Sequence, residues 1–258
     1  MSKLAAEDKF FDLSDYGRTL GKLFANQLKH TRFTPIHVTL LFGASGLVAI
    51  YCIVQQWYYW AAFFIVLKSI IDAADGELAR LKNTPSYVGR YLDSCFDIVL
   101  NFLFLITIGN VCNAPLWLTL AAFVSIQLQG TLYNYYYVIL RHASAGGDVT
   151  SKVFEHQAPI ALHGESQQAV NILFAIYTIV YGGFDKVIHL LDADAYKAKT
   201  FPNWFMTLIS MYGLGFQLLI IAVLLPLGGI AYTLPFFVAY NVFIPVLIVV
   251  RKVVLRVG

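Results

Sequence analysis

Long apolar runs separated by short polar joints occupy most of this chain. The runs lie near 35–55, 57–78, 95–111, 115–140, 169–184, 204–227 and 231–250. A helix needs about 20 predominantly apolar residues to cross a bilayer, and each of the longer runs supplies them. The pattern therefore predicts an all-α fold, a polytopic membrane helix bundle.

The composition agrees with this fold class. Hydrophobic residues make up 59% of the 258 residues and charged residues only 13%, whereas a soluble domain carries about 25% charged residues. These values exclude a soluble, disordered or collagen-like chain. The formal net charge is only +3, and the absence of a basic run predicts no nucleic-acid partner.

The segment before the first run has a pattern of its own. Apolar residues recur there at helical spacing, at Phe10, Leu13, Leu20, Leu23, Phe24 and Leu28. This spacing predicts an amphipathic helix lying in the membrane interface, and the alternative is a helix packed on a soluble partner. We therefore divide the chain into an interfacial segment, 1–33, and a transmembrane domain, 34–258.

The basic residues indicate how the chain is oriented in the membrane. Lys and Arg concentrate before Thr34, between Lys82 and Arg90, at Arg141 and Lys152, and after Val250. Cytoplasmic loops carry an excess of these residues, so all four regions are predicted to be cytoplasmic.

The run 169–184 decides the number of spans. If this run crosses the membrane, there are seven spans and the basic tail lies outside. If it lies in the interface or re-enters, there are six spans and every charged loop lies inside. The apolar run itself favours seven and the charge bias favours six; we predict six transmembrane helices.

Four carboxylates lie where the second and third runs meet. Residues 72–97 read DAADGELARLKNTPSYVGRYLDSCFD. Asp72 and Asp75 share one helical face, and Asp93 and Asp97, four residues apart, share a face of the next helix. Because the loop between the two helices is cytoplasmic, we expect a hairpin that holds the carboxylates at the same depth.

Acids inside a membrane cost roughly 2.5–3.5 kcal/mol each on insertion scales, and they usually mark a functional site. A structural ion-pair network with Arg80, Lys82 and Arg90 leaves a surplus of negative charge, since Glu77 adds a further acid. Oxygen ligands without Cys or His suit Mg²⁺ or Mn²⁺, and paired metals suit phosphoryl displacement. We therefore predict a site for two divalent cations, Mg²⁺ or Mn²⁺.

The spacing D-x2-D-G-x2-A-R-x8-G-x3-D-x3-D resembles the signature of the CDP-alcohol phosphotransferase (CDP-alcohol phosphatidyltransferase) family. All eight fixed positions are met, by Asp72, Asp75, Gly76, Ala79, Arg80, Gly89, Asp93 and Asp97. The resemblance extends over the interfacial helix and the first four spans. One departure lies upstream, where family members often carry Pro-Asn and this chain has Pro35-Ile36, so the usual amide is absent.

The resemblance implies a membrane-embedded homodimer that transfers a substituted phosphate from a CDP-linked donor to an alcohol and releases CMP. It implies three metal ligands, Asp72, Asp75 and Asp93, and a general base, Asp97, that also touches a metal. It further implies contacts to the CDP part of the donor from Gly76, Ala79, Arg80 and Gly89. The expected role is in phospholipid biosynthesis.

The fourth run carries many polar groups at membrane depth, and those that suit the acceptor side are Gln127, Tyr133, Asn134 and Arg141. Such groups face either a cavity or a partner helix, so interhelical hydrogen bonding is the alternative. The loop 143–168 that follows is a candidate lid. The scarcity of cations in the later spans favours a neutral acceptor, either diacylglycerol with CDP-choline or CDP-ethanolamine, or a small alcohol with CDP-diacylglycerol.

The main alternative function is a cation or proton-coupled transporter, because intramembrane acids also line ion paths. Transporters commonly contain an internal repeat, and this chain has no second copy of the acidic hairpin. We therefore expect a multi-pass membrane enzyme whose active site faces the cytoplasm.

Overall fold

The computed structural model describes residues 4, 8–143, 157–198 and 200–254, and every regular element in these ranges is helical. The first half contains α1 (Arg18–Leu28), α2 (Pro35–Val54), α3 (Tyr58–Lys82), α4 (Tyr87–Val111) and α5 (Leu116–Ala143). The second half contains α6 (Gln167–Leu191), α7 (Asn203–Ser210), α8 (Leu214–Leu224), α9 (Thr233–Tyr240) and α10 (Phe243–Val254). Short 3₁₀ turns are η1 (Leu13–Asp15), η2 (Ala195–Lys197) and η3 (Ile230–Tyr232). The predicted all-α class is confirmed.

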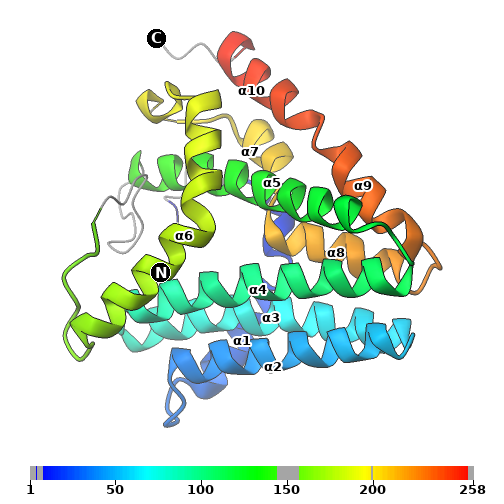
Figure 1. Ribbon diagram of the computed structural model, residues 1–258. Helices are drawn as coiled ribbons and strands as arrows, with labels where there is room; N and C mark the ends of the chain where they lie inside the picture. Colours follow the sequence, from blue (N-terminus) through cyan, green and yellow to red (C-terminus); the bar gives the residue numbers. More distant parts are fainter. Residues whose placement is uncertain (1–3, 5–7, 144–156, 199, 255–258) are drawn as a thin grey trace.

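Helix α2 packs along both α3 and α4, and each of the three helices is antiparallel to the one before it (Figure 1). The helix α1 packs against α3, and α5 packs along α4. The helices α8 and α9 pack against α3 and α5, respectively. The acidic segment thus lies at the centre of the bundle, on α3 and α4.

Two glycines of α2 allow these helices to pack closely. A Cβ on Gly43 would lie 2.7 Å from the ring of Phe96, and a Cβ on Gly46 would lie 2.8 Å from Leu100. These distances are far below van der Waals contact, so α4 approaches α2 more closely than a larger residue would permit. Because α2 also packs along α3, this seam fixes the separation of α3 and α4.

Capping residues define the turn between α3 and α4. The helix α3 ends at Asn83, whose φ of +51° is a left-handed conformation that Asn adopts more readily than most residues. The hydroxyl of Ser86 then caps α4 by accepting a 2.7 Å hydrogen bond from the N–H of Gly89. The end of the bundle that carries this turn, 83–86, is called the turn end below.

The interfacial segment is less helical than predicted. The α-helix covers only Arg18–Leu28, and Phe10 and Leu13 precede it. Gly17 marks the break, because its backbone lies against α3: a Cβ there would be 3.0 Å from the carbonyl oxygen of Ser69. The chain therefore approaches α3 closely at the residue that precedes α1.

Within α1, the two sides of the helix have different surroundings. Phe24 and Leu28 pack against the hydrophobic core, whereas Leu20 and Leu23 are more than half exposed. An apolar side left open beside the bundle is what a helix in the membrane interface requires.

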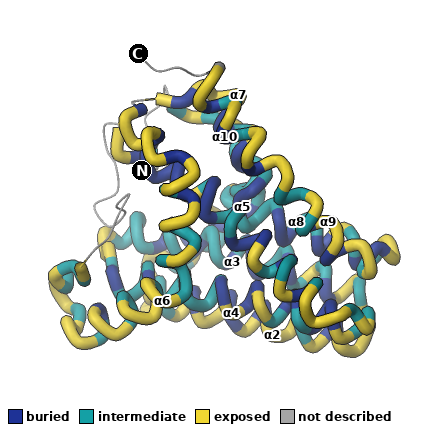
Figure 2. The backbone as a smooth tube through the Cα atoms, turned by 45° about the horizontal axis from the view of Figure 1, so that its top comes forward, coloured by how far each residue is buried: buried dark blue, intermediate teal, exposed yellow. Residues whose placement is uncertain are grey.

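The helices are long and apolar enough for a multi-pass membrane protein. By length and composition, α2, α4, α5, α6 and the segment Ile230–Val253 each suit a membrane span, and α7 with α8, bent by 48°, would make a further one. The helix α3 is as long as α4, but Lys68, Asp72 and Asp75 make it less apolar. Exposed residues, in yellow, cover much of the outside of the bundle (Figure 2). Many of them are large apolar residues, as expected beside lipid.

Both ends of α6 lie at the turn end of the bundle. Just before α6, Glu165 accepts a 2.6 Å hydrogen bond from the hydroxyl of Ser86 at the start of α4. Just after α6, Asp192 accepts a 2.6 Å hydrogen bond from the hydroxyl of Tyr136 in the last third of α5. Because α5 runs antiparallel to α4, both contacts lie near the same end. The helix α6 therefore runs across the ends of α4 and α5 (Figure 1).

The end of α10 returns to the same place. The Nε of Arg251 donates a 2.7 Å hydrogen bond to Asp192, so α10 ends beside Tyr136 and the end of α6. The connection 225–229 lies at the opposite end, where Leu225 and Pro226 line a cavity with Trp57. The ends of α2, α3, α4, α5, α7–α8 and α9–α10 thus lie as the six-span prediction requires. By length and composition α6 also suits a span, so the number of spans stays a prediction.

We predict that Asn83 and Lys252 face the cytoplasm and that Leu227 faces the opposite side. In a background with Cys52, Cys95 and Cys112 replaced by alanine, single cysteines at these three exposed positions are labelled with an impermeant maleimide. Asn83→Cys and Lys252→Cys should react in inverted vesicles only, and Leu227→Cys in right-side-out vesicles only. Labelling of Lys252→Cys together with Leu227→Cys would require a seventh span.

Candidate active site

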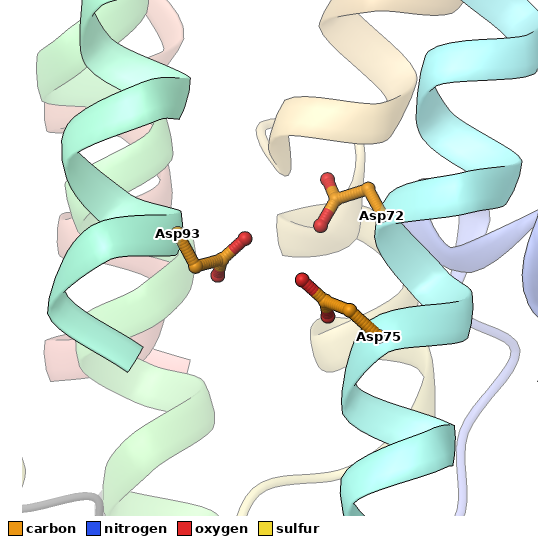
Figure 3. A group of neighbouring side chains, drawn as sticks. All are labelled: Asp72, Asp75 and Asp93. Carbon is orange, nitrogen blue, oxygen red and sulfur yellow. The ribbon is translucent and has the colours of Figure 1, made fainter. Parts of the chain in front are cut away.

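Asp72, Asp75 and Asp93 point toward one another across the space between α3 and α4 (Figure 3). One carboxylate oxygen from each residue lies within 4.8 Å of the others. Asp72 and Asp75 are neighbours on one face of α3, and the short turn 83–86 brings Asp93 on α4 to the same depth. Ionised carboxylates this close repel one another unless cations neutralise them.

Asp97, one turn beyond Asp93, bonds to a buried lysine instead. The ammonium of Lys68 donates hydrogen bonds to Asp97 Oδ1 at 2.5 Å and to Asp72 Oδ2 at 3.1 Å. Lys68 is only 1% exposed, and its Nζ lies 4.7 Å from the centre of the Phe42 ring. Lys68 therefore joins α3 to α4 and connects Asp97 with the group of three carboxylates.

The basic residues considered in the sequence analysis have other partners. The guanidinium of Arg80 pairs with Glu77 at 3.0 Å. The ammonium of Lys82 donates to the carbonyl oxygens of Thr31 and Phe33, at 2.8 and 2.6 Å. These two cations therefore hold the surroundings of the site together rather than pairing with its four aspartates.

Lys68 is the residue that the sequence analysis missed. The signal was present, since Lys68 precedes Asp72 by four residues, the spacing at which side chains of a helix pair. Lys68 stands inside an apolar run, whereas Arg80, Lys82 and Arg90 stand in or near the charged loop. The sequence pattern therefore drew attention to those three cations and not to Lys68.

The carboxylates of Asp75 and Asp93 differ in their hydrogen bonding. The hydroxyl of Thr39 donates a 2.8 Å hydrogen bond to Asp75 Oδ2. Asp93 Oδ1 is buried and has no hydrogen-bond partner among the described residues, which is costly for a polar atom. The four carboxylates face one ammonium, that of Lys68, so negative charge is in excess. This all-oxygen donor set with an unsatisfied buried oxygen fits divalent cations such as Mg²⁺ or Mn²⁺.

The residues predicted to contact CDP lie on the turn-end side of the three carboxylates. Gly76 and Arg80 are one turn apart on α3, and a Cβ on Gly76 would lie 3.6 Å from both terminal nitrogens of Arg80. Ala79, beside them, is half-buried, as is Gly89 one turn before Asp93 on α4. The structure thus brings these four motif residues to one side of the acidic cluster.

Glu165 holds the start of α4 in place. One of its oxygens accepts hydrogen bonds from the hydroxyl of Ser86 at 2.6 Å and from the N–H of Val88 at 2.9 Å. Its other oxygen accepts from the N–H of Leu162 at 3.1 Å. Burial alone would raise the pKa of Glu165, but these hydrogen bonds lower the pKa below its usual value. The sequence analysis assigned no role to Glu165, which lies in the predicted lid, 143–168; residues 144–156 of that loop lie outside the described part of the chain.

A polar cavity of about 220 Å³ adjoins Asp97 and is enclosed by α4, α5, α6 and the start of α8. It contains three of the four predicted acceptor-side residues, Gln127, Tyr133 and Asn134. The fourth, Arg141, is buried outside the cavity, with its guanidinium 5.7 Å from the centre of the Tyr137 ring. The sequence analysis missed the contribution of α6 to this cavity, because nothing in the local pattern places α6 beside α4.

The hydroxyl of Tyr133 is occupied by a contact within the protein. It donates a 2.6 Å hydrogen bond to Asp12 in the interfacial segment. Asp12 in turn caps η1 by accepting from the N–H of Ser14 at 3.0 Å. Tyr133 therefore joins the interfacial segment to α5 at the edge of the polar cavity.

Comparison with known proteins agrees with this geometry. The family profile named CDP-alcohol phosphatidyltransferase matches residues 32–232, which is more than half of the chain. The chain is also 36% identical over 84 residues to "Inner membrane protein YnjF" of Escherichia coli (strain K12), an alignment that covers 32% of this chain and 38% of that protein. No solved structure matches. On the strength of the profile match and of the motif residues gathered between α3 and α4, this chain belongs to the CDP-alcohol phosphatidyltransferase family.

Proposed function

We propose that this protein transfers a substituted phosphate from a CDP-linked donor to an alcohol and releases CMP, as a step of phospholipid biosynthesis. The observation that carries the proposal is the group formed by Asp72, Asp75 and Asp93, whose oxygens lie within 4.8 Å of one another inside a membrane bundle. The family match supports the reaction class, and the excess of negative charge supports a requirement for cations.

Asp72, Asp75 and Asp93 would hold two divalent cations, with Asp97 at the edge of the same site. When bound, such cations neutralise the charge on the phosphate oxygens during the displacement. Arg80, with Gly76 and Ala79 leaving room beside it, binds the donor phosphates through its guanidinium fork. Gly89 at the start of α4 completes the CDP side.

Asp97 takes the proton from the acceptor hydroxyl. The hydroxyl oxygen then forms a bond to the phosphorus, while the bond between that phosphorus and the CMP oxygen breaks and CMP leaves with the electron pair. The ammonium of Lys68, 2.5 Å from Asp97 Oδ1, favours the ionised carboxylate and fixes its orientation. A positioned base of this kind contributes about 10²–10⁴-fold to the rate.

The acceptor in this proposal is an alcohol without charge. The active site faces the cytoplasm, and the protein acts as a homodimer. The first point is supported by the position of Arg141 outside the polar cavity. The second is supported by the basic residues at the turn end, since cytoplasmic loops are rich in Lys and Arg. The transporter alternative receives no support from the family match.

We predict that Mg²⁺ or Mn²⁺ binds at the three carboxylates and stabilises the protein. At about 100 times its dissociation constant, an ion at one site should raise the free energy of unfolding by about 2.7 kcal/mol. Thermal unfolding after EDTA treatment and after Mg²⁺ addition measures this gain, and CMP release should be lost and regained in parallel. Asp93→Asn should lose most of the gain.

The matched control is Asp194→Asn, since Asp194 is an exposed acid whose partner is Lys197. It should keep the full stabilisation by Mg²⁺. Equal stabilisation of Asp93→Asn and wild type would show that the ions bind elsewhere.

We predict that Asp97→Asn lowers kcat by about 10²–10⁴-fold because the amide keeps the shape but cannot take a proton. The dissociation constant for the CDP-linked donor should change little, since Asp97 lies away from Arg80 and Gly76. Asp75→Asn should instead weaken Mn²⁺ binding and donor binding together. CMP release and equilibrium binding measure the two effects. Near-normal kcat in Asp97→Asn would assign proton removal to another residue.

A further inference from the structure

The polar cavity beside Asp97 has a lining of unusual character for the inside of a membrane protein. Among the described residues that line it, only Ile126, Gly130 and Leu214 lack a polar side-chain group, and none is Lys, Arg or His. Its volume is about 220 Å³. A cavity of this size and lining suits a compact hydroxylated molecule and leaves no room inside it for two acyl chains.

Two buried polar groups in this lining are left without a partner. The amide nitrogen of Gln127 and the hydroxyl of Thr131 have no hydrogen-bond partner among the described residues, although the two side chains are only 4% and 5% exposed. They are four residues apart on α5 and so share a face. Buried donors are normally satisfied, so this pair indicates a bound molecule that supplies hydroxyl or carbonyl oxygens.

Other polar residues of the lining, unlike Gln127 and Thr131, have hydrogen-bond partners within the protein. The amide of Gln217 donates to the carbonyl of Ile126 and to Gln129 Oε1, both at 3.1 Å. The hydroxyl of Tyr181 donates to the carbonyl of Ser94 at 3.0 Å. These groups serve the packing of α4, α5, α6 and α8, whereas Gln127 and Thr131 do not.

The charges around the cavity disfavour an anion. Asp97 and Asp185 contribute carboxylates to the lining, whose described residues include no Lys, Arg or His. The ammonium of Lys68 lies outside the lining and is already bonded to Asp97. A phosphorylated molecule would therefore meet like charge in a region of low dielectric. A molecule without a phosphate meets no such penalty.

The position of the cavity assigns it to the acceptor. Its lining includes Asp97 but none of the residues on the CDP side, such as Gly76, Arg80 and Gly89. A hydroxyl held by Gln127 and Thr131 lies on the side of the proposed base. The carboxylate of Asp97 thus lies between the cavity and the proposed donor side.

We infer that the polar cavity binds the acceptor, and that this acceptor is a small head-group alcohol that carries no phosphate. The inference rests on the proposed function and extends it: because the acceptor is water-soluble, the CDP-linked donor is the partner that carries the lipid chains. Gln127 and Thr131 are the residues that determine acceptor affinity.

The experiment measures CMP release by the full-length protein in lipid nanodiscs with Mg²⁺. The donors are CDP-diacylglycerol, CDP-choline and CDP-ethanolamine, the last two with diacylglycerol. With CDP-diacylglycerol, the acceptors are myo-inositol, glycerol and L-serine, each with no net charge and each tested beside its phosphate monoester. We expect release from CDP-diacylglycerol to depend on one of the phosphate-free alcohols and not on its monoester.

Two variants test the site itself. Thr131→Val and Gln127→Leu each remove one hydrogen-bonding group and should raise KM for the alcohol about fivefold, with KM for CDP-diacylglycerol unchanged. Thr119→Val is the matched control, because Thr119 is equally buried on the same helix but outside the cavity. It should leave both KM values unchanged.

Three results would overturn the inference. Productive transfer from CDP-choline or CDP-ethanolamine to diacylglycerol, or preference for a phosphate monoester, would keep the proposed function and reject this acceptor. An unchanged KM for the alcohol in both variants would reject the site. If no donor releases CMP, the proposed function fails, and thermal stabilisation of wild type by the alcohols, compared with Thr131→Val, decides the inference: no stabilisation would reject it.

Discussion

The burial of four carboxylates against one ammonium, between α3 and α4, is the constraint on which the rest of the structure depends. Asp72, Asp75 and Asp93 approach within 4.8 Å of one another, an arrangement that their repulsion opposes. The bundle imposes it through the close packing of α2 and the capped turn before α4. Lys68, 1% exposed, offsets part of the repulsion and joins the two helices.

A second buried acid, Asp192, forms an ion pair whose role is structural. Asp192 is fully buried, yet it accepts hydrogen bonds from Tyr136 and from two nitrogens of Arg251. Every charge in that contact is matched, and it holds the ends of α5, α6 and α10 together. The contrast with Asp93, which has a buried oxygen without a partner in the described part of the chain, distinguishes a structural ion pair from a cluster of carboxylates that could hold cations.

In the proposed reaction, this arrangement would separate the two substrates in space. Arg80, Gly76 and Gly89 lie toward the turn end, while the polar cavity lies beyond Asp97, between α4 and α5. Asp97 stands between these two regions and is held by Lys68 at 2.5 Å. In the proposed reaction, a base in this position would meet the hydroxyl of an acceptor held in the polar cavity.

The helical class, the approximate spans and the acidic motif could be predicted from the sequence, because hydrophobic length and residue spacing along a helix are local properties. Asp72, Asp75 and Asp93 had to converge once two capped helices met in a short turn. The position of α6 could not be predicted, since an apolar run looks the same whether its helix lies across the membrane or along it. Its two ends are placed only by the contacts of Glu165 with α4 and of Asp192 with α5. Lys68 as a bridge to Asp97, and the cavity around Gln127 and Thr131, likewise depend on side chains far apart in the sequence, and tertiary packing alone brings those together.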